Sequence, residues 1–222
     1  MERREPRAYL AEFLGTALLL AAIVGSGIMA ERSSPTDEGL QLLQNALATA
    51  LALGALIVAF GPISGAHFNP AVTLTDAVLG GTPWSAVPGR IAAQVAGGGL
   101  GVVVTHLQFG LPAVTLGTRD RAAPTLWLAE VVATVGLLLV IFLTVRRGDR
   151  QQIPWAVAGF VFGAIFFTSS TCFANPAVTL ARALTDSFTS IAPSSVGPFL
   201  LAQLAAVAGA VGLIRVLAPS EG

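Results

Sequence analysis

The sequence contains few charged residues and no lysine. Only 11% of its 222 residues are charged, whereas about a quarter are charged in an ordinary soluble domain. Twelve arginines balance twelve acidic residues, so the formal net charge at pH 7 is zero. Because no excess of basic residues is available to attract a polyanion, the composition argues against nucleic-acid binding.

Cysteine is also scarce. Cys172 is the only one, so the chain cannot form an internal disulfide. A pair of cysteines with the spacing of a zinc or redox site is therefore absent too. The sequence predicts no metal site and no cofactor.

Long hydrophobic runs dominate what remains. Hydrophobic residues make up 54% of the chain, and the mean hydropathy is +0.77. A helix of roughly 20 apolar residues crosses about 30 Å of hydrocarbon. Six stretches qualify, near Leu10 to Met29, Leu40 to Phe60, Ser85 to Leu107, Leu126 to Val145, Trp155 to Phe167 with its neighbours, and Val196 to Leu217. We therefore predict an integral membrane protein whose main solvent is the lipid bilayer.

A repeat divides the chain into two similar halves. Residues 69–74 and residues 175–180 both read Asn-Pro-Ala-Val-Thr-Leu, and each motif begins a short apolar segment about half a membrane long. Each half contains three spans, and because three is odd, the second half starts on the opposite side of the membrane. We predict one domain over residues 1–222, with inverted repeats at about 8–110 and 124–218.

The two motifs, Asn69-Pro70-Ala71 and Asn175-Pro176-Ala177, suit the first turn of a helix. Asparagine can cap a helix start, and proline tolerates the first helical position. Two such half-helices meet start to start, and their partial positive charges repel cations and protons. The asparagine amides can then donate hydrogen bonds to a neutral solute, and carbonyl groups of the preceding segments, 61–68 and 169–174, can accept them.

The stretch from Ser64 to Thr73, together with the second motif, resembles the two signature loops of the aquaporin or major intrinsic protein family. The resemblance covers nearly the whole chain. It implies an all-α membrane fold of six transmembrane helices and two re-entrant half-helices. It also implies a passive channel for water and small neutral solutes, without a cofactor, that assembles as a homotetramer with one pore per subunit.

Matching polar residues inside the spans recur in both halves. Ala-Glu occurs at residues 11–12 and 129–130, and Ala-Gln occurs at residues 93–94 and 202–203. The resemblance implies that Glu12 and Glu130, accompanied by Gln94 and Gln203, hold the N–H groups of the re-entrant loops. The alternative is a proton relay, because carboxylates within membrane spans often serve one.

The sequence departs from the family pattern at the selectivity filter. Typical members have arginine directly after the second Asn-Pro-Ala, whereas this chain has Val178. Counting from the motifs without gaps places the four filter positions at Thr49, Gly163, Cys172 and Val178. These side chains are small or uncharged, so we predict a wide filter that admits solutes larger than water. The aspartate of glycerol facilitators is replaced by Thr179.

This filter, with the sequence of residues 175–186, resembles the aquaporin-like channels found with bacterial arsenic-resistance genes. That resemblance implies arsenite or related organoarsenical hydroxides as cargo, with water and glycerol as the alternative.

Other classes of membrane protein are alternatives to a channel. A secondary transporter normally has more spans than this chain, and it has ion-coordinating groups in its unwound segments. A membrane enzyme would need a nucleophile, an acid and a base, and no such set lies near the motifs. A purely structural junction protein remains a further alternative.

Three other residues are candidates for the pore. Arg182 lies one helical turn after Val178 and can replace the missing cation, or it lies at the outer surface or pairs with Asp186. His67 resembles a family residue at the cytoplasmic end of the pore, or it packs within its loop. Cys172 is either a pore thiol or a buried structural thiol.

The arginines indicate the orientation in the membrane. If all six spans cross, eight arginines lie on the side of the termini and four on the other. The first group is Arg3, Arg4, Arg7, Arg90, Arg146, Arg147, Arg150 and Arg215, and the second is Arg32, Arg119, Arg121 and Arg182. We predict a multi-pass protein of the cell (inner) membrane with both termini in the cytoplasm.

Overall fold

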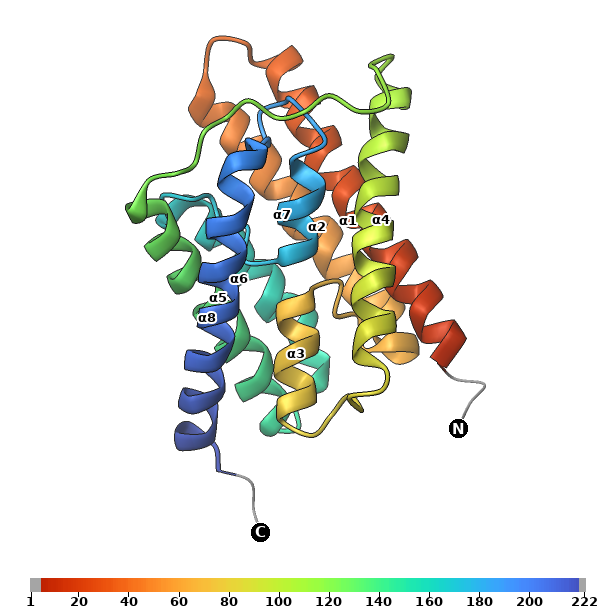
Figure 1. Cartoon of the computed structure of the whole chain (residues 1–222), viewed down its shortest axis with the longest axis vertical. Coiled ribbons are helices and arrows are strands. Elements are labelled where there is room, and N and C mark those ends of the chain that lie inside the picture. Colours follow the sequence, from red (N-terminus) through yellow and green to blue (C-terminus); the bar gives the residue numbers. More distant parts are fainter. Residues whose placement is uncertain (1–4, 220–222) are drawn as a thin grey trace.

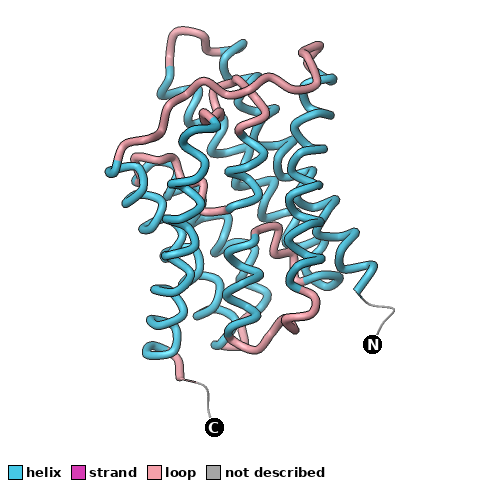
Figure 2. Tube along the Cα trace, viewed as in Figure 1, coloured by secondary structure: helices cyan, strands magenta, loops and turns pink. Residues whose placement is uncertain are grey.

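The computed structural model describes residues 5–219, which form helices and loops (Figures 1 and 2). The helices are α1 (Glu5–Ser33), α2 (Glu38–Ser64), α3 (Pro70–Val78), α4 (Val87–Gln108), α5 (Pro124–Arg146), the short 3₁₀ helix η1 (Arg150–Gln152), α6 (Ile153–Phe167), α7 (Pro176–Arg182) and α8 (Pro193–Leu217). Within the described residues no strand occurs. This confirms the predicted all-α membrane fold.

Helices α1, α2, α4, α5 and α8 are long and apolar enough to cross a membrane by themselves. Helix α6 has 15 residues, which at 1.5 Å per residue gives about 22 Å. It follows η1 directly and ends at Phe167, because Thr168 adopts an extended backbone conformation. The fifth predicted span is therefore present but shorter than the other five.

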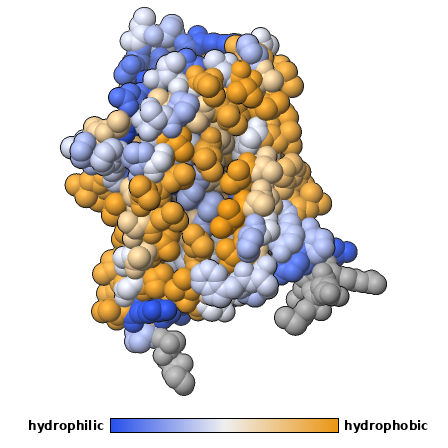
Figure 3. All heavy atoms as spheres, in the orientation of Figure 1, coloured by the Kyte–Doolittle hydropathy of each residue, from blue (hydrophilic) through white to orange (hydrophobic). Residues whose placement is uncertain are grey.

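The outer surface of the bundle is apolar along its middle. Figure 3 shows hydrophobic residues over most of the visible face and hydrophilic residues gathered toward the two ends. Large apolar side chains are exposed on several long helices, including Leu18 on α1, Leu51 on α2, Leu128 on α5 and Leu201 on α8. In water such a surface would be unfavourable, so it is suited to contact with lipid tails.

The elements follow one another in the same order in both halves. Helix α1 packs against α2 and α4, and α5 packs against α6 and α8. The half-helices α3 and α7 lie in opposite halves of the bundle and meet near its middle (Figure 1). Both described ends of the chain lie at the lower end in Figure 1, here called the terminal end. The opposite end, crossed by the loop of residues 109–123, is called the distal end.

Helices α1 and α4 approach each other closely because α4 carries glycine at the contact. A methyl group on Gly97 or Gly101 would collide with the backbone carbonyl oxygen of Phe13 or Ala17. Small residues at four-residue spacing are a common means of close helix packing in membranes. This contact fixes α1, which carries Glu12, beside α4, which carries Gln94.

Candidate functional site

A cavity of about 800 Å³ lies inside the bundle. Its lining includes residues of α3, on the side of the terminal end, and of α7, on the side of the distal end, together with the asparagine of each Asn-Pro-Ala motif. Most of its wall is aliphatic. The apolar lining includes Leu53, Ile57, Leu137, Val157, Val161, Ile165 and Val178, and the polar lining includes Asn45, Thr49, Asn69 and Asn175. Polar and charged side chains line it as well, among them His67, Asp76, Arg90 and Arg182, so the wall is apolar in its larger part but not throughout.

The two asparagines cap the half-helices as predicted and also connect the two halves. Asn69 Oδ1 accepts from the N–H of Ala71 at 2.8 Å, and Asn175 Oδ1 accepts from that of Ala177 at 3.0 Å. Each amide nitrogen donates to the opposite loop, at 2.8 Å in both cases. One N–H of each amide is thus used, and the second is available to a solute because both residues line the cavity.

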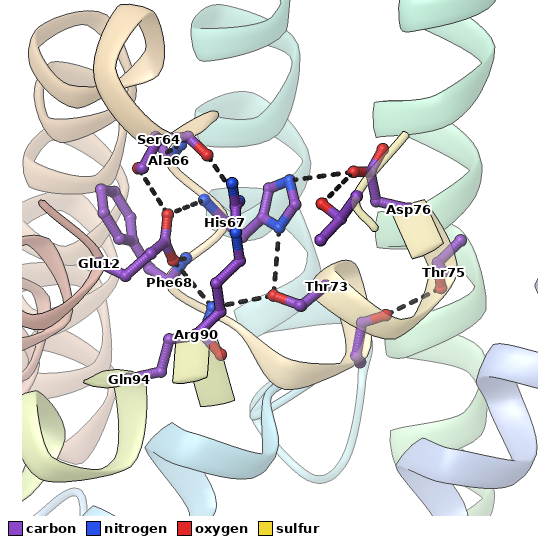
Figure 4. A network of polar contacts seen from close by, with 12 residues as sticks. Glu12, Ser64, Ala66, His67, Phe68, Thr73, Thr75, Asp76, Arg90 and Gln94 are labelled. Carbon is purple, nitrogen blue, oxygen red and sulfur yellow. Dashed lines mark hydrogen bonds and ion pairs between the residues drawn. The ribbon is translucent and has the colours of Figure 1, made fainter. Parts of the chain in front are cut away.

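Glu12 holds the loop before α3 (Figure 4). Its side chain is fully buried. One carboxylate oxygen accepts from Ser64 Oγ at 2.6 Å and from the N–H of His67 at 3.0 Å. The other accepts from the N–H of Phe68 at 2.6 Å and from Gln94 Nε2 at 2.8 Å. A carboxylate suits this position because it only accepts hydrogen bonds, and four donors converge on it.

Glu130 performs the equivalent task in the second half. It too is fully buried, and it accepts from the N–H groups of Phe173 at 2.9 Å and Ala174 at 2.8 Å. Gln203 Nε2 donates to Glu130 at 2.7 Å and to Thr179 Oγ1 at 2.9 Å. Gln94 bonds Glu12 and a threonine in the same way. The Glu–Gln–Thr arrangement therefore occurs once in each half.

The loops before the half-helices have an unusual backbone. Ala66, Phe68, Thr171, Cys172 and Ala174 all have positive φ angles between 45° and 63°. Non-glycine residues rarely adopt this conformation, so it persists only where surrounding contacts hold it. The bonds to Glu12 and Glu130 supply such contacts. The first non-helical segment is shorter than predicted, because α2 continues through Pro62 to Ser64.

Three of the four predicted filter residues line the cavity. These are Thr49, Cys172 and Val178. The hydroxyl of Thr49 has no hydrogen-bond partner among the described residues. The structure differs from the prediction at Gly163, which is not among the lining residues and whose missing Cβ would approach only Phe167.

Gly163 is not a lining residue because it lies on a different face of α6 from the residues that line the cavity. The residues of α6 that line the cavity beyond its first turn are Val157, Val161 and Ile165, which are spaced by four and share one helix face. Gly163 lies two positions from Val161 and from Ile165, so its Cα faces away from that side. Counting without gaps cannot detect this rotation.

Arg182 and His67 both line the cavity. Arg182 is 6% exposed and does not pair with Asp186, whose carboxylate accepts instead from Thr118. Neither the surface position nor the ion pair predicted as an alternative for Arg182 is therefore present. His67 Nδ1 lies 3.1 Å from Thr73 Oγ1, and its Nε2 lies 3.7 Å from Asp76 (Figure 4).

Sequence reasoning missed the surroundings of Arg182. Its guanidinium lies over the ring of Phe173, 3.5 Å from the centroid, and Arg121 approaches the same ring at 4.8 Å. Arg121 comes from the distal loop, where burial lowers its pKa to about 10, so it stays charged at neutral pH.

Asp76 was also missed, although it follows Asn69 at the same spacing in the sequence as Arg182 follows Asn175. Comparing the two repeats beyond the shared six residues would have found it.

The comparisons with known proteins agree with this geometry. Residues 2–172 match the family model described as Major intrinsic protein. The chain is 43% identical over 209 residues to Aquaglyceroporin AqpS of Rhizobium meliloti, covering 94% of this chain and 89% of that protein. It is 35% identical over 218 residues to Aquaporin NIP1-4 of Oryza sativa subsp. japonica, covering 93% and 76%.

A solved structure shares the fold. The X-ray structure of the aquaglyceroporin from Plasmodium falciparum superposes with a TM-score of 0.74 at 20% sequence identity. The match covers 97% of this chain and 96% of that one. Both chains are therefore built on the same helical plan along nearly their full length.

Proposed function

Because the chain belongs to the major intrinsic protein family, whose members are passive membrane channels and not enzymes, we propose that it passes uncharged solutes larger than water. The preferred cargo is arsenite or a related organoarsenical hydroxide. These solutes are neutral near pH 7 and carry several hydroxyl groups. The chain itself is an integral, multi-pass membrane protein.

The proposal depends on the presence of Val178 in place of the arginine that typical family members have there. Val178 lies directly after the second Asn-Pro-Ala, lines the cavity and is 3% exposed. An arginine there would fill part of the passage and bind solute oxygens through its N–H groups. Valine does neither, so the passage is wider and its wall more apolar.

We assign the four positions of the filter to Thr49, Ile165, Cys172 and Val178. Ile165 takes the place first predicted for Gly163, because it is the last cavity-lining residue of α6 before the chain turns into the loop of residues 168–174. With one hydroxyl and one thiol, this filter has little capacity for hydrogen bonding. A pore of that kind selects by size more than by polar recognition.

Water and glycerol are the alternative cargo. The relative from Rhizobium meliloti and the structural neighbour from Plasmodium falciparum are both named aquaglyceroporins, which favours glycerol as a permeant. A secondary transporter of the same cargo would differ by requiring a gradient. Solute entry that depended on sodium or proton gradients would favour the transporter over the channel.

We further propose a homotetramer in the cell (inner) membrane, with both termini in the cytoplasm. Arg90, Arg146, Arg147, Arg150 and Arg215 support this orientation, because they belong to the terminal end of the bundle. Arg3 and Arg4, counted with them in the sequence, lie outside the described residues. The same order of elements in both halves supports the repeat boundaries at about 8–110 and 124–218.

The test is stopped-flow light scattering on proteoliposomes, comparing water, glycerol and arsenite for the wild type, Val178→Arg and Val178→Met. We expect Val178→Arg to slow glycerol and arsenite at least about tenfold, because the guanidinium narrows the passage. Val178→Met controls for side-chain length without charge. A wild type that admits water but neither glycerol nor arsenite would refute the proposal of a wide filter. Arsenite entry that is no faster than in protein-free vesicles would show that arsenite is not a cargo of this channel.

A further inference from the structure

The two half-helices carry opposite charges at equivalent positions. Asp76 is the seventh residue after Asn69, and Arg182 is the seventh residue after Asn175. Both line the cavity. Helices α3 and α7 run in opposite directions from the middle of the bundle (Figure 1), so Asp76 belongs to the half-helix on the side of the terminal end and Arg182 to the half-helix on the side of the distal end.

The two charged groups of this pair differ in their polar partners. Asp76 accepts from Thr82 Oγ1 at 2.6 Å and lies 3.7 Å from His67 Nε2. Arg182 has no carboxylate within 4.0 Å among residues 5–219. Its Nε donates to the carbonyl oxygen of Thr189. Its two terminal nitrogens donate to no acceptor among residues 5–219. Those nitrogens are therefore available to water or solute in the cavity.

The guanidinium of Arg182 is held in place by contacts beneath it. Its stacking distance of 3.5 Å from the Phe173 ring centroid is that of a close cation–π contact. Phe173 is itself fixed, because Glu130 accepts a hydrogen bond from its N–H and its ring packs edge-on against Phe199 at 5.2 Å. The charge of Arg182 is thus fixed at the distal end of the cavity instead of moving freely in solvent.

Arg121 adds a second positive charge behind the same ring. Its Nε donates to the carbonyl oxygen of Ser190 and its Nη1 to that of Ser170, each at 3.1 Å. It does not line the cavity. Since both guanidinium groups lie over one ring, they are closer than ~10 Å, about one Debye length at 0.1 M salt. Arg121 is thus close enough to influence Arg182, and it does so from outside the cavity.

We propose that Arg182 is the cation-rejecting residue of this channel, and that Arg121 positions it through Phe173. The barrier then lies one helical turn beyond Val178, where typical family members carry their arginine. A fixed positive charge beside a mostly apolar passage raises the energy of any entering cation but not of a neutral solute. The pore can therefore be wide at Val178 and still exclude cations. This inference rests on the proposed channel function.

The experiment measures sodium and proton entry together with glycerol entry in proteoliposomes. For Arg182→Met we expect the ratio of cation flux to glycerol flux to rise at least about tenfold, because the methionine keeps an apolar stem but removes the charge. Arg182→Lys retains the charge and should keep most of the barrier. Arg32→Met is the matched control, because it removes an exposed arginine that contacts Phe109 at the same end, and its ratio should equal that of the wild type.

Arg121 is tested by a double-mutant comparison. Arg121→Met should raise the flux ratio less than Arg182→Met does, and the double variant should leak no more than Arg182→Met alone, because Arg121 acts through Arg182. Equal and additive effects of the two substitutions would contradict the positioning role.

An Arg182→Met channel that passes glycerol and excludes cations as well as the wild type does would overturn the proposal. If Arg182→Met yields no folded protein, Arg182→Gln takes its place, since it retains a donor for Thr189 and must show the same leak. A wild type that admits no neutral solute would instead overturn the proposed function, so the two failures are distinguishable.

Discussion

Asn69 and Asn175 each donate a hydrogen bond to the loop that carries the other. Asn69 Nδ2 lies 2.8 Å from the carbonyl oxygen of Ala174, and Asn175 Nδ2 lies 2.8 Å from that of Phe68. The two re-entrant segments are thereby joined at the middle of the bundle, although more than one hundred residues separate them in the chain. Each asparagine is thus both a helix cap and a cross-link.

We expect Asn175→Ala to destabilise the protein by about 2 kcal/mol, from the lost cap and the lost buried hydrogen bond. Asn175→Ser keeps a cap acceptor for the N–H of Ala177 but loses the amide donor to Phe68, so its loss should be smaller. Thermal unfolding in detergent measures both variants. If Asn175→Ala were as stable as the wild type, the cross-link would contribute nothing.

Glu130→Gln should be strongly destabilising. The substitution replaces one acceptor oxygen by an NH₂ group, which then faces either the N–H of Phe173 or the two donors from Ala174 and Gln203. At least one buried polar group would lose its partner, which costs about 1–3 kcal/mol, and more where a charged group is involved. Melting temperature and yield of folded protein measure the effect. Glu31→Gln, at an exposed site, is the control and should be neutral.

The same variant separates the structural role of Glu130 from a proton relay. If Glu130 carried protons, the folded fraction of Glu130→Gln would show reduced proton flux with intact solute flux. We expect no proton-coupled component in the wild type, because this carboxylate is occupied by the loop N–H groups of Phe173 and Ala174 and by the amide of Gln203.

Mercury should block the channel through Cys172. This residue is the only cysteine and lines the cavity beside the second motif. A mercury ion bound there would obstruct solute flow. Glycerol uptake by the wild type should therefore fall on mercury treatment, and uptake by Cys172→Ser should not. Insensitivity of the wild type would place the thiol away from the solute path.

Gly97→Ala should separate α1 from α4. The new methyl group collides with the backbone at Phe13, which cannot move as a side chain can, so we expect a loss of about 1–3 kcal/mol. Gly212→Ala on α8 is the matched control, because nothing lies within 4 Å of its added carbon. It should be neutral or stabilising by up to about 1 kcal/mol. Circular dichroism melting curves compare the two.

Much of the fold was predictable from hydrophobic length and from the duplicated motif. Six apolar runs and two Asn-Pro-Ala segments predicted α1 to α8, and the recurrence of Glu12 and Gln94 as Glu130 and Gln203 predicted that the halves are alike. These features depend on local composition and on identity between segments, which a sequence displays directly. The end of α2 was less predictable, because Pro62 lies inside that helix without ending it.

The sequence by itself determined the membrane fold, the two capping asparagines and the absence of arginine at Val178, because each follows from residue type and spacing along the chain. Only the tertiary structure decided that Ile165 and not Gly163 lines the cavity, since this depends on the rotation of α6. Only the tertiary structure also brought Arg121 to the ring of Phe173 beside Arg182. That contact depends on the path of the distal loop across the bundle, which local patterns in the sequence do not encode.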